Sequence, residues 1–323
     1  MSKNFKILLG TLLFFVLILI AVNLNVGFIK LQFSDFFSSD SQNYQIAELR
    51  INRVLVMLLA GISIPTAGFL LQEYFQNPIA GPEVLGISSV GSLAVAVYIF
   101  LFSNVQLPEF LQNSFISIAA ISGSVLLMLI LLIFSRKFQD KTYLIIFGFL
   151  VSAFTGAIIS VMQLYADNQN LKNYLLWNFG ANNQASRNQI YVLGIFVFIG
   201  IFLCFKTIKP LIGNAFGAQY AQSLGVNLTQ LKVLIIITSS IFSAAVTAFI
   251  GPVLFIGIVV PHFCRMLWNP SQLWHQWILN MMMGVITMEF FSIFSEILKL
   301  PINIMTSILG IPIVFMMLLK KKA

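Results

Sequence analysis

The sequence predicts an all-α integral membrane protein with ten transmembrane helices. Of its 323 residues, 59% are hydrophobic and only 9% are charged, whereas an average soluble domain carries about 25% charged residues. The apolar residues also fall into long runs, and about 20 apolar residues let a helix cross the hydrocarbon core of a membrane. This composition excludes a soluble domain, a disordered chain, a disulfide scaffold and a free DNA-binding domain.

Ten apolar stretches follow one another along the chain. No polar segment between them reaches about 50 residues, the lower size of a domain. We therefore expect residues 1–323 to form a single transmembrane domain, without a nucleotide-binding domain of its own. The predicted spans are residues 5–22, 54–72, 84–102, 115–134, 143–165, 190–208, 233–250, 252–267, 275–297 and 302–319.

The placement of lysine and arginine predicts the orientation. Cytoplasmic loops of membrane proteins carry an excess of these residues. With the N-terminus inside, twelve of the 18 lie inside and six outside, so both termini are predicted to be cytoplasmic. The basic excess therefore needs no nucleic acid to explain it. The inside set is Lys3, Lys6, Arg136, Lys137, Lys141, Lys206, Lys209, Lys232, Arg265, Lys320, Lys321 and Lys322. The outside set is Lys30, Arg50, Arg53, Lys172, Arg187 and Lys299.

Three connections are long enough to have a role of their own. Residues 23–53 form an outside loop, and residues 166–189 form a second one with a short amphipathic helix at 171–177. Residues 209–232 form the largest inside loop. That loop contains a short helix, which Gly225 is predicted to end from the C′ position.

Few side chains could carry chemistry. Cys204 and Cys264 lack the spacing of a metal or redox pair, so we interpret them as small apolar fillers. His262 and Cys264 lie two residues apart, on different sides of a helix. We expect no metal site and no cofactor. Nothing resembles a nucleophile with its base, which argues against a membrane-embedded enzyme.

Glu289 and Glu296 share one face of the predicted span 275–297. A carboxylate within a membrane indicates function by default, and a proton or cation relay would fit an ion-coupled secondary transporter. We expect no lysine, arginine or histidine in the middle of another span to pair with them. A structural hydrogen bond, or a protonated side chain, is therefore the favoured interpretation.

Three stretches, in this order, resemble one known family. The sequence is similar to the FecCD family, the permease subunits of type II ABC importers for iron–siderophores, haem and cobalamin. The similar stretches are Leu49-Arg50-Ile51-Asn52-Arg53 with Gly68 to Gln72 and Asn77 to Gly86, then Ala221 to Asn227 with Gly251 to Arg265, and finally Leu300 to Ile302 with Gly310 to Phe315.

The resemblance implies an importer whose energy comes from ATP hydrolysis in another subunit. It implies a separate ATPase on the inside, a substrate-binding protein on the outside, and a pathway at the interface of a homodimer or of two related permeases. The chain itself would have no catalytic residues. The cargo we expect is an iron chelate (a ferric siderophore) crossing the inner membrane. Haem and cobalamin remain alternatives.

The resemblance also assigns roles to residues. Arg50 matches an outward arginine that meets acidic groups of the binding protein, and Arg53 and Lys299 are further docking candidates. Two positions depart from the family pattern: Asn52 stands where proline is common, and Lys299 is the candidate replacement for a second docking arginine. The segment 216–225 corresponds to the ATPase contact, with Phe216, Ala218, Gln219, Ala221, Ser223, Leu224 and Gly225 as its residues.

A pathway for a bulky, often anionic chelate should be uncharged, because tight binding would slow release. We therefore expect it along the small and polar faces of three spans. Its inner gate would lie near Lys141 and Thr142. The alternative is that these hydroxyl groups bond back to their own helices. The candidates are Ser63, Thr66, Gln72, Ser88, Ser89, Ser92, Ser152, Thr155 and Ser160.

Overall fold

The computed structural model describes residues 3–37, 41–102, 109–137, 141–180, 185–268 and 272–320. All regular structure within these ranges is helical. The α-helices are α1 (Lys3–Asn25), α2 (Tyr44–Phe75), α3 (Ile87–Phe102), α4 (Glu109–Lys137), α5 (Thr142–Tyr165), α6 (Asn168–Phe179), α7 (Arg187–Ala215), α8 (Ala218–Ser223), α9 (Leu228–Ile250), α10 (Ile256–Leu267), α11 (Leu273–Leu298) and α12 (Ile302–Lys320). The 3₁₀ turns are η1 (Phe33–Phe36) and η2 (Pro82–Leu85).

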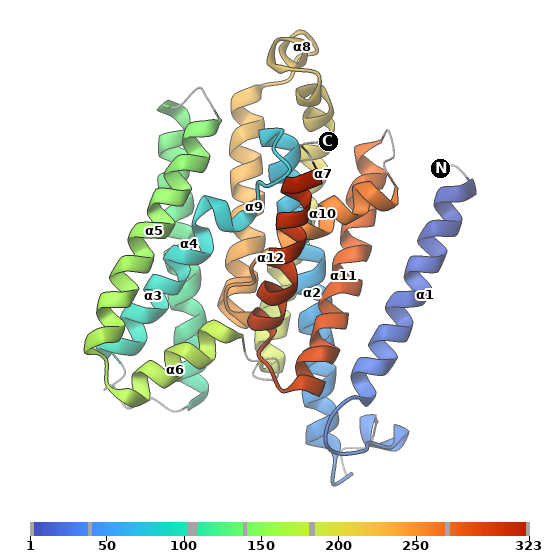
Figure 1. Ribbon diagram of the computed structural model, residues 1–323, viewed down its shortest axis with the longest axis vertical. Coiled ribbons are helices and arrows are strands. Elements are labelled where there is room, and N and C mark those ends of the chain that lie inside the picture. The colour runs from blue at the N-terminus through green and yellow to red at the C-terminus, as the bar shows by residue number, and fades with distance from the viewer. Residues whose placement is uncertain are drawn as a thin grey trace.

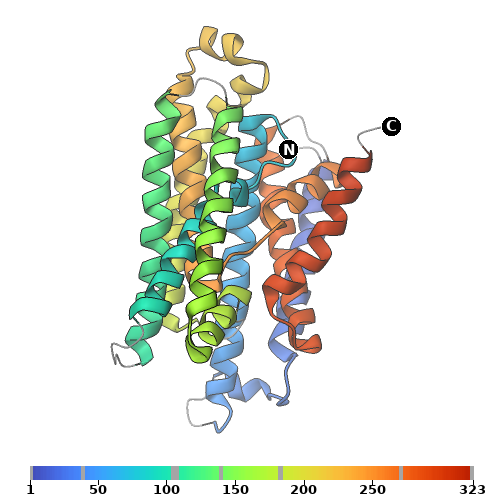
Figure 2. The same ribbon diagram turned by 60° about the vertical axis from the view of Figure 1, so that its left-hand side comes forward.

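The long helices run side by side between two ends of the molecule (Figure 1). The start of α1 and the end of α12 lie at the same end as α8, which we call the α8 end, and α6 lies at the opposite α6 end. Helices α3 to α6 form one side (Figures 1 and 2), and in Figure 1 helix α1 stands at the other edge beyond α11. Termini at a shared end agree with an even number of crossings.

The predicted fold class is confirmed. Among the described residues, seven helices are long and apolar enough to cross a membrane: α1, α2, α4, α5, α7, α9 and α11. Three shorter apolar helices, α3, α10 and α12, complete the ten predicted stretches. Helix α10 has 12 residues, which spans about 18 Å. The non-helical residues 251–255 precede it, and such backbone is tolerated at membrane depth only inside protein or along a cavity.

Helix α2 is the central element and packs against α7, α9, α10 and α11. Two of these contacts join backbone to backbone. A Cβ atom on Gly68 would stand 1.8 Å from the Gly257 carbonyl oxygen of α10, and one on Gly284 of α11 would stand 2.0 Å from the Gly61 oxygen. Only glycine permits such approach, because any side chain would hold the helices apart.

Some predicted boundaries were wrong. Helix α2 begins at Tyr44, well before position 54, so Arg50 and Arg53 lie within a helix and not in an outside loop. Helix α7 likewise continues past position 208 to Ala215. Hydropathy treats charged residues as loop, although here neighbouring groups bind them. The predicted helix at 171–177 is confirmed within α6, whose first turn is capped by the Asp167 side chain.

Cys204 and Cys264 are both fully buried among apolar side chains, as the sequence predicted.

Candidate functional site

A cavity of about 440 Å³ lies among α3, α5, α6 and α12. Five of the predicted pathway residues line it: Ser88, Ser89, Ser92, Ser152 and Thr155. The remaining lining includes Pro252 and Leu254 of the non-helical segment, so this irregular backbone borders a cavity, where its polar groups can be satisfied.

Hydroxyl groups on the cavity wall already have partners. Ser88 Oγ lies 3.0 Å from Ser243 Oγ and accepts a hydrogen bond from Thr247 at 2.9 Å. Ser152 and Thr155 donate to carbonyl oxygens of α5, at 2.9 and 3.0 Å. These side chains therefore present a neutral surface that needs no ligand to satisfy it.

Other pathway candidates lie elsewhere. Ser63 and Thr66 are fully buried in α2 and donate to carbonyl oxygens one turn back, at 2.7 and 2.6 Å. The Gln72 amide nitrogen lies 3.4 and 3.3 Å from carbonyl oxygens of α10. Ser160 bonds back to Gly156 on an exposed face. These four residues do not line the cavity, and their bonds fit the alternative of bonding within and between helices.

Sequence reasoning missed Glu83, the charged residue in the described lining. Both of its carboxylate oxygens are inaccessible to solvent, and no side chain among the described residues bonds to them. A Cβ atom on Gly81 would stand 2.7 Å from one of them, so only glycine leaves room for the carboxylate there. The sequence did indicate this position, because Glu83 is an acidic residue within the family-like stretch from Asn77 to Gly86.

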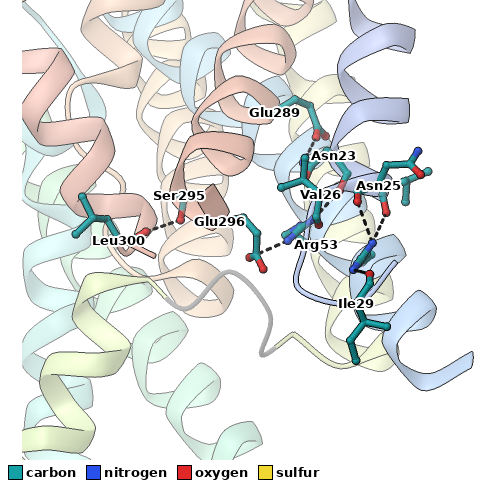
Figure 3. A network of polar contacts seen from close by, with 11 residues as sticks. Asn23, Asn25, Val26, Ile29, Arg53, Glu289, Ser295, Glu296 and Leu300 are labelled. Carbon is teal, nitrogen blue, oxygen red and sulfur yellow. Dashed lines mark hydrogen bonds and ion pairs between the residues drawn. The ribbon is translucent and has the colours of Figure 1, made fainter. Parts of the chain in front are cut away.

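At the α6 end, two arginines of α2 hold the end of α1 (Figure 3). Arg50 donates to the carbonyl oxygens of Leu24, Asn25 and Ile29, at 3.1, 3.2 and 2.5 Å. Arg53 donates to the carbonyl oxygens of Asn23 and Val26, at 2.5 and 2.9 Å. Both side chains are buried, at 5% and 2% exposure.

Arg53 and Asn23 also contact the acidic residues of α11. Arg53 Nη1 lies 2.8 Å from Glu296 Oε2, and Asn23 Nδ2 donates to Glu289 Oε2 at 2.5 Å (Figure 3). The expectation that no cation would pair with these carboxylates was wrong for Glu296, because α2 starts earlier than hydropathy indicated. For Glu289, a structural hydrogen bond is confirmed. We call Asn23, Arg50, Arg53, Glu289 and Glu296 the Arg53 cluster.

Lys299, the third docking candidate, is exposed at the C-terminus of α11. Its backbone adopts the left-handed conformation, with φ of 56°. Its ammonium group lies 4.6 Å from the centre of the Phe28 ring, which belongs to the α1–α2 connection. Of the three candidates, only this side chain reaches the surface.

At the α8 end, the predicted short helix is present as α8. Gly225 has φ of +79°, and the bonds from Gly225 N to Gln222 O (2.9 Å) and from Val226 N to Ala221 O (3.0 Å) form a Schellman motif. Gly225 therefore ends the helix from the C′ position, as predicted. Apart from Ala221, which is buried, the candidate contact residues Phe216, Ala218, Gln219, Ser223, Leu224 and Gly225 are exposed.

A groove of about 650 Å³ lies between α8 and the adjoining ends of α7 and α9. Phe216, Leu224 and Gly225 line it together with Tyr220. Phe216 is 70% exposed and Leu224 is 61% exposed, and α8, which lies between them in the chain, projects beyond the ends of the long helices (Figure 1).

Lys141 and Thr142 stand where α5 begins, at the α8 end. Lys141 does not line the cavity. Its ammonium group instead reaches the ends of α2 and α7. Burial and the positive charge of Lys232 lower the pKa of Lys141 from its usual value. Among the described residues, no three His, Cys, Asp or Glu side chains gather as metal ligands would.

These features define a polytopic helical bundle with a cavity lined mainly by uncharged groups and with exposed apolar side chains around a short helix outside the bundle. Comparison with known proteins gives the class: this is the permease subunit of an ABC importer, not an enzyme, and ATP hydrolysis takes place in a separate subunit. The FecCD transport family profile matches residues 13–321, and the chain belongs to that family. It is therefore a protein of the inner membrane.

Two curated relatives cover almost the whole chain. The hemin transport system permease protein HmuU of Yersinia pestis is 28% identical over 98% of this chain and 96% of its own length. The iron(3+)-hydroxamate import system permease protein FhuG of Bacillus subtilis is 27% identical over 99% of both. A solved structure, described as an inward-facing conformation of a transporter of the metal-chelate ABC type, has a TM-score of 0.84. At 21% identity, over 98% of this chain and 99% of the other, it supports the fold alone.

Proposed function

We propose that this permease carries a ferric siderophore through the cavity described above. The observation that carries this proposal is a lining of hydroxyl, amide and apolar groups, in which Glu83 is the one charged residue among those described. A bulky chelate meets hydroxyl and amide groups there, without a lysine, arginine or histidine in the described lining to retain it. The iron(3+)-hydroxamate relative supports the same cargo class. The hemin relative makes haem the second candidate, and cobalamin is the third.

Uptake into proteoliposomes tests the cargo. The vesicles would hold the permease, its ATPase and its binding protein, with radiolabelled ferric hydroxamate, hemin and cobalamin supplied in turn. We expect ATP-dependent uptake of the ferric chelate. Import of hemin or cobalamin alone would overturn the siderophore assignment and leave the importer class intact.

Weak binding by the isolated permease is a second expectation. The substrate should be held by the binding protein, because a conduit that binds tightly releases slowly. A submicromolar dissociation constant for the chelate, about −8 kcal/mol or stronger, would contradict a low-affinity conduit.

The cavity is proposed to lie at the interface of a homodimer or of two related permeases. Helices α5 and α12 both border it, and both expose large apolar side chains, such as Phe154 (68%) and Phe315 (61%). Gly156 lines the cavity and has open space beside it. A Gly156→Cys variant should cross-link to a neighbouring copy within the assembled transporter, and its failure to do so would count against this interface.

We place the α8 end in the cytoplasm, where α8 would contact the ATPase. Described basic residues at this end include Arg136, Lys137, Lys141, Lys206, Lys209, Lys232 and Arg265. Lys321 and Lys322, which entered the charge count, lie outside the described residues. Cysteines at Ala218 or Ser223 should be labelled only from inside and cross-link to the ATPase. Labelling from outside would reverse the topology.

Docking of the binding protein is proposed at the α6 end, around Lys299. Arg50 and Arg53 would contribute by holding the α1–α2 connection in place, because their own charges are buried. Lys299→Glu should weaken stimulation of ATP hydrolysis by the binding protein. An exposed charge is a cleaner test than Arg50→Glu, which would set a carboxylate against three carbonyl oxygens.

A further inference from the structure

We propose that Lys141 is a positioning residue that links the movement of α8 to α5, the helix on the cavity wall. The inference rests on the proposed contact between α8 and an ATPase. Lys141 stands immediately before α5. Its side chain reaches the C-terminal ends of two other helices, α2 and α7.

The ammonium group of Lys141 has three interactions. It donates to the Tyr74 carbonyl oxygen at 2.7 Å and to Asn214 Oδ1 at 3.0 Å. It also lies 4.4 Å from the centre of the Tyr74 ring. Carbonyl groups at a helix C-terminus carry partial negative charge, so the end of α2 favours a cation there. Replacing the ammonium group by an apolar end would remove all three interactions at once.

Asn214 connects this point to α8. It lies one residue before the end of α7, and α8 begins at Ala218. Its side chain is 1% exposed and uses both ends of the amide. Oδ1 accepts from Lys141, and Nδ2 donates to the Tyr74 carbonyl oxygen at 3.4 Å. Movement of α8 that displaces the end of α7 must therefore move the acceptor of Lys141.

Gln76 reinforces the same junction from the C-cap of α2. Its Nε2 donates to the carbonyl oxygens of Asn214 and Ala215, at 3.1 and 3.4 Å. We call Tyr74, Gln76, Lys141 and Asn214 the Lys141 clasp. It joins α2, α5 and α7 through bonds to backbone carbonyl oxygens and through the bond from Lys141 to Asn214 Oδ1, and because Lys141 is partly exposed, water can replace the partners of its ammonium group. The clasp can therefore open and close without leaving a buried charge unpaired.

On the other side, Lys141 is connected to the cavity by an unbroken helix. Ser152 and Thr155, both on the cavity wall, follow it on α5. A rise of 1.5 Å per residue places Ser152 about 16 Å along the axis from Lys141. Displacing one end of a helix displaces the other, so the clasp sets the position of α5 and with it the width of the cavity.

The test measures ATP hydrolysed per chelate imported by the full transporter, with its ATPase and binding protein in proteoliposomes. In Lys141→Met, hydrolysis should continue while uptake falls, which raises this ratio by about ten-fold, within the range for single residues that carry coupling. Lys137→Met, an exposed lysine at the same end, should leave the ratio unchanged. Loss of hydrolysis and uptake in parallel, or no change in either, would overturn the proposal.

A double-mutant cycle covers the case in which Lys141→Met does not fold. Lys141→Arg keeps a cationic donor but changes its shape, and Asn214→Ala removes the side-chain acceptor of Lys141. Their combination should raise the ratio no further than Asn214→Ala alone, whereas independent effects would multiply and contradict the clasp. If the cargo proves to be cobalamin, the ratio is measured with cobalamin. If α8 fails to cross-link to the ATPase, the proposed function fails first, and the two failures are distinguishable.

Discussion

Both ends of α2 are joined to neighbouring helices by cations, but α2 supplies the cations at one end and the acceptors at the other. At the α6 end, α2 supplies the cations, Arg50 and Arg53, and the last turn of α1 supplies the carbonyl acceptors. At the α8 end, α2 supplies the acceptors, and Lys141 and Arg265 bring the cations. In both places a positive charge meets the C-terminus of a helix, where the helix dipole favours it.

The difference lies in depth. The two arginines differ, because the Arg53 side chain is 1% exposed and the Arg265 side chain 25%, whereas their partners Glu296 and Glu73 are alike at 23% and 21%. The Arg53 contact cannot open cheaply, because the buried guanidinium would be left without its partner in a low-dielectric interior. We therefore expect the contacts at the α6 end to stay formed during transport, as a fixed joint, and the contacts at the α8 end to break and form again.

The largest effect should come from Arg53→Met. It leaves Glu296 without its cation and removes two bonds to the end of α1, so we expect a loss of about 3 kcal/mol in unfolding free energy. The measurement is thermal denaturation of the purified permease in detergent. Arg187→Met is the matched control, because its contact with Glu48 is long (4.0 Å) and exposed. Equal melting temperatures for the two variants would show that the α6 end is no fixed joint.

Asn23→Leu should have the next largest effect. It deprives Glu289 of its 2.5 Å hydrogen bond in a fully buried position, at a cost of about 1–3 kcal/mol. Asn25→Leu, two residues away with an exposed side chain, should change stability little. Comparable losses from both variants would mean that Asn23 contributes helix packing and not a bond to α11.

At the α8 end, Arg265→Gln should cost about 1 kcal/mol or less, as is usual for partly exposed pairs. Glu73→Gln should cost a similar amount, and the double variant should cost no more than either alone, because Arg265 and Glu73 contact each other at 2.8 Å. A loss as large as that of Arg53→Met would remove the contrast between the two ends.

Lys299→Gln should have the smallest effect on stability, about 0.5 kcal/mol from the exposed cation–π contact with Phe28. If Lys299 docks the binding protein, the same change should nevertheless lower stimulated ATP hydrolysis clearly. A variant with both properties unchanged would argue against docking at this position.

Much of the fold could be predicted from the sequence, because hydropathy reports directly on burial in lipid. The ten apolar stretches and the helix ended by Gly225 follow from local composition and turn chemistry. Five of the predicted pathway residues share one cavity, and their role in transport stays a prediction. Ser63 and Thr66 have the same chemistry but face other helices, which only the packing of α2 decides.

The missed features all depend on partners far away in the chain. A hydropathy window counts Arg53 as a loop residue, because it cannot detect a carboxylate on α11. Lys141 and Asn214 are 73 positions apart, so no pattern in the sequence around either residue indicates their hydrogen bond. Glu83 was overlooked because its surroundings, and not its neighbours in sequence, make it unusual.

The contact between Asn23 and Glu289 has a consequence for biogenesis. The two residues are 266 positions apart, so at a synthesis rate of about 5–20 residues per second Asn23 waits for tens of seconds after it is made. Arg53, only 30 positions beyond Asn23, is available almost at once. Helices α1 and α2 can therefore enter the membrane with the bonds between Arg53 and the end of α1 already formed. The contact with α11 forms late, when nearly the whole chain has left the ribosome.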